Sequence, residues 1–285
     1  MGCNQFMKKS IFLILTLTFI LSFQITTNAL GFDIPQEVKV PILMYHFLAK
    51  DDKNPNPWQI RVEQFESDII MLKNEGFEAV FMQDLINFVY RNIPLPEKPI
   101  VISFDDGASD FYSFAFPLLK EHNTKAVMAI IGSTTDKFSE DTEQNKYFKS
   151  NMNWEQIREL KNSGLIEIQS HSYDLHKGSG AAKKKGESIE AYRERFIKDA
   201  DKFNERVLAE LDILPTTFVF PFGSQSKESN DVLKSAEFLA SFTCREIVSI
   251  VRVNDPNSLF DLGRVLRSRK MTSESMVAKI NSLQS

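Results

Sequence analysis

Cysteine is scarce in this chain of 285 residues, which contains only Cys3 and Cys244. Cys3 precedes an apolar N-terminal segment, and we predict below that both are removed by cleavage of a signal peptide. The mature chain would then hold a single cysteine. An internal disulfide is then impossible, and the hydrophobic core must stabilise the fold without covalent help. At 42% hydrophobic and 25% charged residues, the composition is that of an ordinary globular protein.

The chain also lacks an excess of positive charge. Its formal net charge is −4, which gives no electrostatic footprint for a nucleic-acid partner. A run of three lysines at 183–185 lies among glycine, serine and alanine, and we interpret it as a solvated loop.

The one long apolar run is too short to span a membrane comfortably. Residues 11–23 carry no charge and follow Lys8 and Lys9, but a spanning helix needs about 20 apolar residues. The small-x-small sequence Thr27-Asn28-Ala29 follows, as at a signal-peptidase site. We therefore predict a signal peptide at 1–29, a linker at 30–39 and one catalytic domain at 40–285. The alternative is an uncleaved membrane anchor.

Strand-like and helix-like segments alternate along the predicted domain. Short apolar runs typical of strands occupy 40–46, 77–81, 100–104, 126–131, 165–169, 216–220, 239–243 and 262–266. Segments with helical spacing occupy 61–75, 83–91, 109–122, 154–163, 188–211, 231–236 and the chain from 273 onward, and we expect a long polar loop at 133–152. Alternation of this kind favours an α/β fold with a parallel sheet. We predict a single irregular (β/α) barrel of about seven parallel strands, similar to a TIM barrel.

Two adjacent carboxylates follow the apolar run at 100–104. Asp105 and Asp106 cannot both face one cavity in a regular strand, and Gly107 would allow the backbone to turn there. The carboxyl ends of parallel strands carry the chemistry of α/β folds, although such a pair could also serve only as a turn and helix cap.

Histidine is also rare, with four in the chain. His46, His171 and His176 each lie at or just beyond the end of a predicted strand, whereas His122 lies late in a predicted helix and is interpreted as structural. In a barrel these strand ends meet on one face, so the three histidines and the carboxylate pair would share a cavity.

Two imidazoles and one carboxylate leave a metal ion with open positions, as in catalytic zinc sites. We expect one divalent ion, Zn²⁺ first, with Co²⁺, Ni²⁺ or Fe²⁺ as alternatives. Asp174 could orient a ligand ring or could simply form a turn.

The sequence at 104–107 and the segment from His171 to His176 resemble the first two motifs of the polysaccharide deacetylases, carbohydrate esterase family 4. The resemblance runs from about residue 40 to the C-terminus. It implies that Asp105 is the catalytic base and that Asp106, His171 and His176 hold the metal.

The sequence departs from the family pattern in three places. The two histidines are five residues apart rather than four, which is similar to the branch that de-N-acetylates poly-β-1,6-N-acetylglucosamine. The third motif is reduced to 220–223 without its arginine, so what orients Asp105 is open, with Arg264 as one candidate. No histidine lies near the C-terminus, and the resemblance implies that His46 is the general acid instead.

The expected function is metal-dependent hydrolysis of N-acetyl groups on an extracellular or cell-surface N-acetylglucosamine polysaccharide. Phe222, Gly223 and Arg264 are candidates for contacts to the substrate or its oxyanion. Alternatives are an O-acetyl esterase acting on xylan or peptidoglycan and a non-catalytic glycan-binding barrel. We expect a secreted monomer, associated with the membrane or cell wall if the N-terminal segment is retained, with a polysaccharide as its partner and no nucleic acid.

Overall fold

Seven parallel strands form the central sheet of the computed structural model, which describes residues 34–51, 57–140 and 150–285. The predicted signal peptide and the start of the predicted linker lie outside the described residues. The strand order is β10 (Ala240–Phe242), β9 (Thr217–Val219), β8 (Ile166–Ser170), β7 (Ala126–Ile130), β6 (Pro99–Phe104), β2 (Ile42–Tyr45) and β12 (Val265–Leu266). Each neighbouring pair is parallel. The predicted fold class is confirmed.

The two edges of this sheet meet through the last strand segment. Leu262 forms a parallel bridge with Phe242 of β10, and shortly afterwards β12 pairs with β2. The sheet therefore curls into an irregular barrel, and the carboxyl ends of the first and last strands become neighbours. A short eighth strand, β5 (Glu78–Ala79), pairs with the start of β6.

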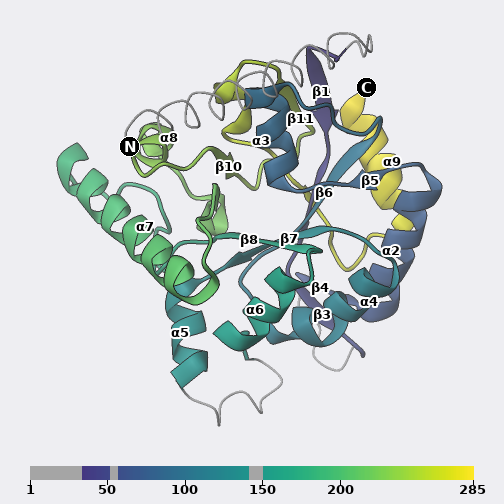
Figure 1. Cartoon of the computed structure of the whole chain (residues 1–285), viewed down its shortest axis with the longest axis horizontal. Coiled ribbons are helices and arrows are strands. Elements are labelled where there is room, and N and C mark those ends of the chain that lie inside the picture. Colours follow the sequence, from purple (N-terminus) through teal and green to yellow (C-terminus); the bar gives the residue numbers. More distant parts are fainter. Residues whose placement is uncertain (1–33, 52–56, 141–149) are drawn as a thin grey trace, which may run out of the picture. The chain divides into compact units, whose positions relative to one another are not determined.

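Helices surround the strands (Figure 1). They are α2 (Val62–Asn74), α3 (Met82–Arg91), α4 (Phe116–Glu121), α5 (Gly132–Glu140), α6 (Trp154–Asn162), α7 (Ile189–Leu211), α8 (Ser229–Ser235) and α9 (Ser273–Gln284). A π-helical turn, η1 (Phe111–Ala115), precedes α4, and the 3-10 turns η3 (Pro221–Gly223) and η4 (Pro256–Leu259) follow later. Asn153 caps α6 by accepting a hydrogen bond from the Gln156 N–H, as its sequence predicts.

Four strands were not predicted by the sequence. β1 (Glu37–Val40) pairs antiparallel with β11 (Ser249–Arg252), so the segment 37–39 belongs to the fold rather than to a linker. β3 (Phe47–Ala49) pairs in parallel with β4 (Gln59–Arg61). The sequence of β1 alternates polar and apolar residues, but over only four positions, which is too short to indicate a strand by itself. A partner more than 200 residues away stabilises it.

The helix α5 corrects the prediction of a long polar loop after Gly132. Its sequence, rich in serine and threonine, has weak helix propensity. Tertiary contacts compensate, because the Asp136 carboxylate accepts hydrogen bonds from Trp154 Nε1 at 2.8 Å, Tyr173 OH at 3.0 Å and Arg206 Nε at 2.9 Å. These partners are distant in sequence, so no local pattern could indicate them.

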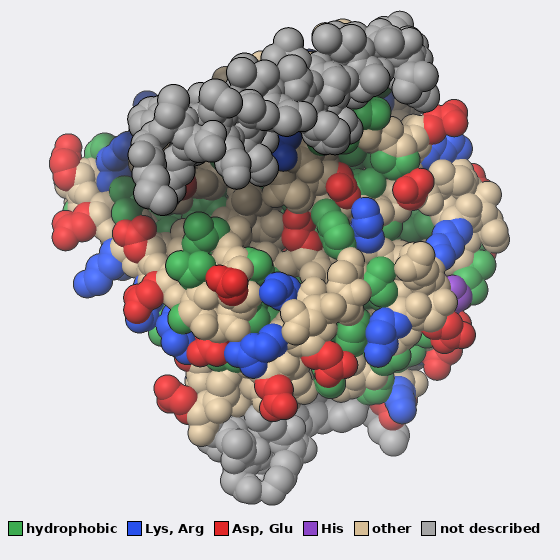
Figure 2. Space-filling view, in the orientation of Figure 1, with side chains coloured by type: hydrophobic (Ala, Val, Ile, Leu, Met, Phe, Trp, Pro, Cys, Tyr) green, Lys and Arg blue, Asp and Glu red, His purple; other side chains and the backbone are tan. Residues whose placement is uncertain are grey.

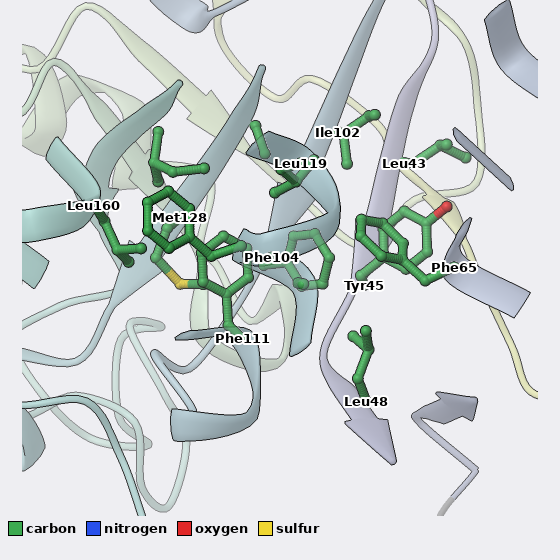
Figure 3. Close-up of a cluster of buried hydrophobic side chains, with 14 of the residues drawn as sticks. Leu43, Tyr45, Leu48, Phe65, Ile102, Phe104, Phe111, Leu119, Met128 and Leu160 are labelled. Carbon is green, nitrogen blue, oxygen red and sulfur yellow. The ribbon is translucent and has the colours of Figure 1, made fainter. Parts of the chain in front are cut away.

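An aromatic cluster packs beneath the ends of β2 and β6 (Figure 3). The Tyr45 ring stacks on Phe104 with centroids 5.0 Å apart, and Phe65 and Phe111 meet Phe104 edge-on at 5.3 and 4.7 Å. Tyr45 and Phe104 are also partners in the strand register. The residues that follow them, His46 and Asp105, are therefore held side by side by a rigid apolar base.

Acidic and basic side chains are interspersed on the face that Figure 2 shows. None of the helices in the described part of the chain combines the length and apolar character needed to cross a bilayer.

Candidate metal centre and active site

The acidic turn after β6 separates its two carboxylates by a reversal of the backbone. Asp106 has φ of +72° and Gly107 has φ of +75°, so the turn begins one residue earlier than glycine alone would allow. Aspartate tolerates this left-handed conformation better than most residues. Asn151 supports it by donating to the Asp106 carbonyl at 2.7 Å. Both carboxylates can therefore reach the same face of the barrel.

Asp105 is held by a buried arginine from the last strand segment. Arg264 donates to Asp105 Oδ1 at 2.7 Å and to Oδ2 at 2.9 Å, and both side chains are almost completely buried. Burial raises the pKa of Asp105, but the Arg264 guanidinium and nearby His171 together lower it by more. The pKa of Asp105 therefore lies below the ordinary value. The carboxylate is thus ionised and has a fixed orientation.

Asp106, His171 and His176 form the other half of the site. The Nε2 atoms of His171 and His176 lie 3.5 and 3.2 Å from Asp106 Oδ1. Burial raises the pKa of Asp106, but the two imidazoles hold it well below the ordinary range. One ligand atom from each of the three side chains lies within 4.8 Å of the others, close enough to share a metal ion.

The donor chemistry of this trio fits a divalent cation. His171 Nδ1 must donate to the Val219 carbonyl at 2.9 Å, so a neutral His171 has its lone pair on Nε2. That lone pair faces Asp106 Oδ1, a buried oxygen without a hydrogen-bond partner among the described residues. Two acceptors that face each other are stabilised by a cation between them, and a backbone acceptor on the second ring nitrogen is typical of a metal-bound histidine.

His46 approaches Asp105 from the end of β2. Its Nε2 lies 3.9 Å from Asp105 Oδ2, and the ring packs 5.1 Å from Trp58. Burial lowers the pKa of His46, although Asp105 and Asp106 oppose the shift. The imidazole is partly exposed, with 17% of its side-chain surface accessible, so a substrate could reach it.

The reduced third motif forms one wall of the site. Phe222 has φ of +61°, a costly conformation for an aromatic residue, and its exposed ring packs 4.4 Å from His176. The Gly223 N–H already donates to the Phe220 carbonyl at 2.9 Å, so it is not available as an oxyanion donor. A side chain at Gly223 would collide with Cys244, since a Cβ there would lie 2.8 Å from the Cys244 Cβ.

Two sequence expectations change in the structure. Asp174 does not orient a ligand ring, because its exposed carboxylate pairs with Lys177 and accepts from Ser133 Oγ. The acceptor for His171 is instead the Val219 carbonyl. Arg264 is fully buried and pairs with Asp105, which fits the expected role of orienting Asp105 better than a contact to substrate.

Two further residues near the site were missed from the sequence. Trp58, 44% exposed beside His46, follows a polar, proline-containing segment, and a tryptophan in such a segment is a usable signal for a binding surface. Asp199 on α7 accepts hydrogen bonds from the loop between the two histidines. Nothing distinguishes it in sequence from other acidic helix residues.

The comparisons with known proteins agree with this geometry. A family model described as polysaccharide deacetylase matches residues 92–240, just over half of the chain. The poly-β-1,6-N-acetyl-D-glucosamine N-deacetylase of Escherichia coli K12 is 27% identical over 225 residues, covering 70% of this chain but 33% of that protein. The Staphylococcus aureus MSSA476 protein of the same name is 25% identical over 207 residues, covering 73% of this chain and 67% of its own length. This chain thus spans about a third of the E. coli relative.

Solved structures share the fold. A de-N-acetylase from Aggregatibacter actinomycetemcomitans matches with a TM-score of 0.71 and 26% identity, covering 85% of this chain and 100% of that one. The Streptococcus pyogenes deacetylase PplD, solved with acetate, matches with the same TM-score of 0.71 at 21% identity and covers 85% of this chain and 98% of that one. Together with the family model, these likenesses show that the chain belongs to the polysaccharide deacetylase family.

Proposed function

We propose that this protein is a metal-dependent deacetylase that hydrolyses N-acetyl groups on an N-acetylglucosamine polysaccharide. The observation that carries the proposal is the pairing of two half-sites at one end of the barrel. One is the Arg264–Asp105 pair, and the other is the cluster of Asp106, His171 and His176. The names of the E. coli and S. aureus relatives support the substrate class.

Asp106, His171 and His176 would hold the metal, Zn²⁺ being the ion that this ligand set suits best. The ion, when bound, would polarise the amide carbonyl and make the attacking water more acidic.

Asp105 would accept the proton of the attacking water. Its low pKa makes it a weaker base than one poised near neutrality, but it is ionised across the physiological range and Arg264 fixes its direction. His46 Nε2 lies 3.9 Å from Asp105 Oδ2, and His46 in its protonated form, which the neighbouring carboxylates favour against burial, would give a proton to the departing amine. An amide needs this proton, because an amine anion is a very poor leaving group.

Phe222 and Trp58 would contact the sugar on either side of the site. Both rings are substantially exposed, and each packs beside a histidine of the site. Exposed apolar rings at the edge of a polar cavity are suited to the apolar faces of sugar rings. The backbone N–H of Phe222 is our candidate for an oxyanion donor.

Substitution of the two aspartates separates their proposed roles. We expect Asp106→Asn to lose both metal binding and acetate release, and Asp105→Asn to keep the metal while acetate release falls at least 100-fold. Metal content is measured by elemental analysis, and acetate is measured after incubation with N-acetylglucosamine oligomers. A folded Asp106→Asn protein that keeps both properties would contradict the assignment.

The same assay compares the alternatives. Preferential acetate release from acetylated xylan would indicate an O-acetyl esterase. Glycan binding without acetate release, with any added divalent ion, would indicate a non-catalytic barrel. The missing third-motif arginine favours that last alternative, but Arg264, just before β12, forms an arginine–aspartate pair with Asp105.

We further propose that the protein acts outside the cell, brought there by the N-terminal segment, as a monomer. N-terminal sequencing of the protein recovered from culture medium and from membranes would distinguish cleavage after Ala29 from a retained anchor.

A further inference from the structure

The loop that joins His171 to His176 is held by a carboxylate from another element. Asp199 lies on α7, and its Oδ1 and Oδ2 accept hydrogen bonds from the backbone N–H groups of Tyr173 and Asp174, both at 2.8 Å. Two adjacent N–H groups that point the same way need two acceptors. A carboxylate offers both oxygens in one rigid group, together with a charge that strengthens each bond.

The loop also forms hydrogen bonds with the start of α5. The N–H groups of Gly132 and Ser133 donate to the carbonyls of Ser172 and Tyr173 at 3.1 and 2.8 Å. Gly132 permits this approach, because a Cβ there would lie only 2.6 Å from Tyr173 Cδ2. The loop is thus held between two helices: its carbonyl groups accept hydrogen bonds from α5, and its N–H groups donate hydrogen bonds to Asp199 of α7.

The two histidines depend on this clamp to different degrees. His171 directly follows β8, is buried, and has its ring fixed by the Val219 carbonyl. His176 lies beyond the loop, is partly exposed, and lacks a comparable ring contact to backbone among the described residues, although it packs against Phe222. The position of its Nε2, 3.2 Å from Asp106 Oδ1, therefore depends mainly on the path of residues 172–175.

We infer that Asp199 is a positioning residue of the metal centre, acting through the 172–175 loop on His176. This inference rests on the proposed function only in requiring that the trio binds a divalent ion. It gives the spacing of five residues a physical reason. The loop carries one internal hydrogen bond, from the Leu175 N–H to Ser172 Oγ at 3.0 Å. The Asp199 carboxylate and the α5 contacts restrain its backbone further, before the metal arrives.

The test measures metal affinity directly, without relying on turnover. Zn²⁺ or Co²⁺ is titrated against a competing chelator into the full-length protein and its Asp199→Asn variant. Asparagine keeps the size of the side chain but turns one acceptor into an NH₂ group that faces a backbone N–H. We expect the dissociation constant to rise about 10- to 100-fold and the visible spectrum of bound Co²⁺ to change. Asp201→Asn, two residues along α7 and exposed, is the matched control and should bind as the wild type does.

A double-mutant cycle with His176→Ala separates positioning from general loss of stability. If Asp199 acts through His176, the Asp199→Asn effect on metal affinity should largely disappear once His176 is removed. An undiminished effect in that background, or a folded Asp199→Asn protein with affinity within twofold of wild type, would overturn the inference. If Asp199→Asn does not fold, Asp199→Glu retains both oxygens and the charge at a displaced position, and the same criteria apply to it. A wild-type protein that binds no divalent ion would instead refute the proposed function.

Discussion

Replacing Arg264 with methionine tests whether the buried ion pair serves catalysis or only the fold. Methionine keeps much of the length of the side chain but leaves Asp105 buried without its counter-charge. Arg264 makes two bonds to Asp105, at 2.7 and 2.9 Å, and both residues are at most 2% exposed. Removing one partner of such a pair costs about 3–5 kcal/mol of stability while the other remains charged. Arg264 opposes the effect of burial on Asp105, so the pKa of Asp105 should rise once the guanidinium is gone.

The kinetic consequence follows from the sign of that shift. Asp105 accepts a proton only when it is ionised, so the variant should lose more activity at pH 6 than at pH 8. We expect kcat/KM for acetate release from N-acetylglucosamine oligomers to fall at least 100-fold at neutral pH, within the range that a positioned general base contributes. The acidic limb of the pH–rate profile should move to higher pH. Urea unfolding, recorded in parallel, gives the change in stability.

A second buried pair in the same barrel provides a matched control. Arg267 binds Asp68 at 2.7 and 3.0 Å, and both side chains are fully buried. Arg267 also donates to the carbonyls of Ser268 and Met271, so Arg267→Met should cost at least as much stability, but it should not shift the acidic limb. If the two variants lose stability and activity in parallel with unchanged pH profiles, Arg264 has only a structural role and the proposed role of Asp105 is weakened. If Arg264→Met does not fold, Arg264→Lys can replace it in the same measurements. Lysine keeps the positive charge but cannot form the bidentate contact to both oxygens of Asp105.

Two other predictions concern the carboxylate of Glu167, which is half-buried, and the exposed ring of Phe222. Glu167 accepts hydrogen bonds from the first N–H groups of α3, and burial raises its pKa to about 7. The folded state therefore keeps a proton that the unfolded chain loses near pH 4.5, so this group should cost up to about 3 kcal/mol of stability as pH rises from 4.5 to 7. Denaturation of wild type and Glu167→Gln at pH 5 and pH 8 should show a gain for the variant that grows with pH, and a constant difference would contradict the shift. Phe222→Ala should raise KM for the oligomers several-fold, and an unaltered KM would show that the ring does not contact sugar.

Local sequence patterns were enough to predict most of the fold. Short apolar runs and helical stripes follow from the side-chain periodicities of strands and helices, which act within a few residues. They placed the ends of β2, β6 and β8, and hence His46, the acidic pair and His171, at one edge of a parallel sheet. Pairings such as β1 with β11, and the helix α5, depend on partners far along the chain, so local patterns did not indicate them.

The candidate site, like the fold, was predicted from the sequence only in part. The sequence by itself determined which residue types could hold a metal and move protons, because only histidine and aspartate at strand ends offer that chemistry here. Only the tertiary structure decided that Arg264 faces Asp105, that Val219 fixes the tautomer of His171, and that Asp199 holds the histidine loop. These contacts join residues that are 26 to 159 positions apart in the sequence. Such separations carry no periodic signal, so only the packing of strands and helices against one another brings these residues together.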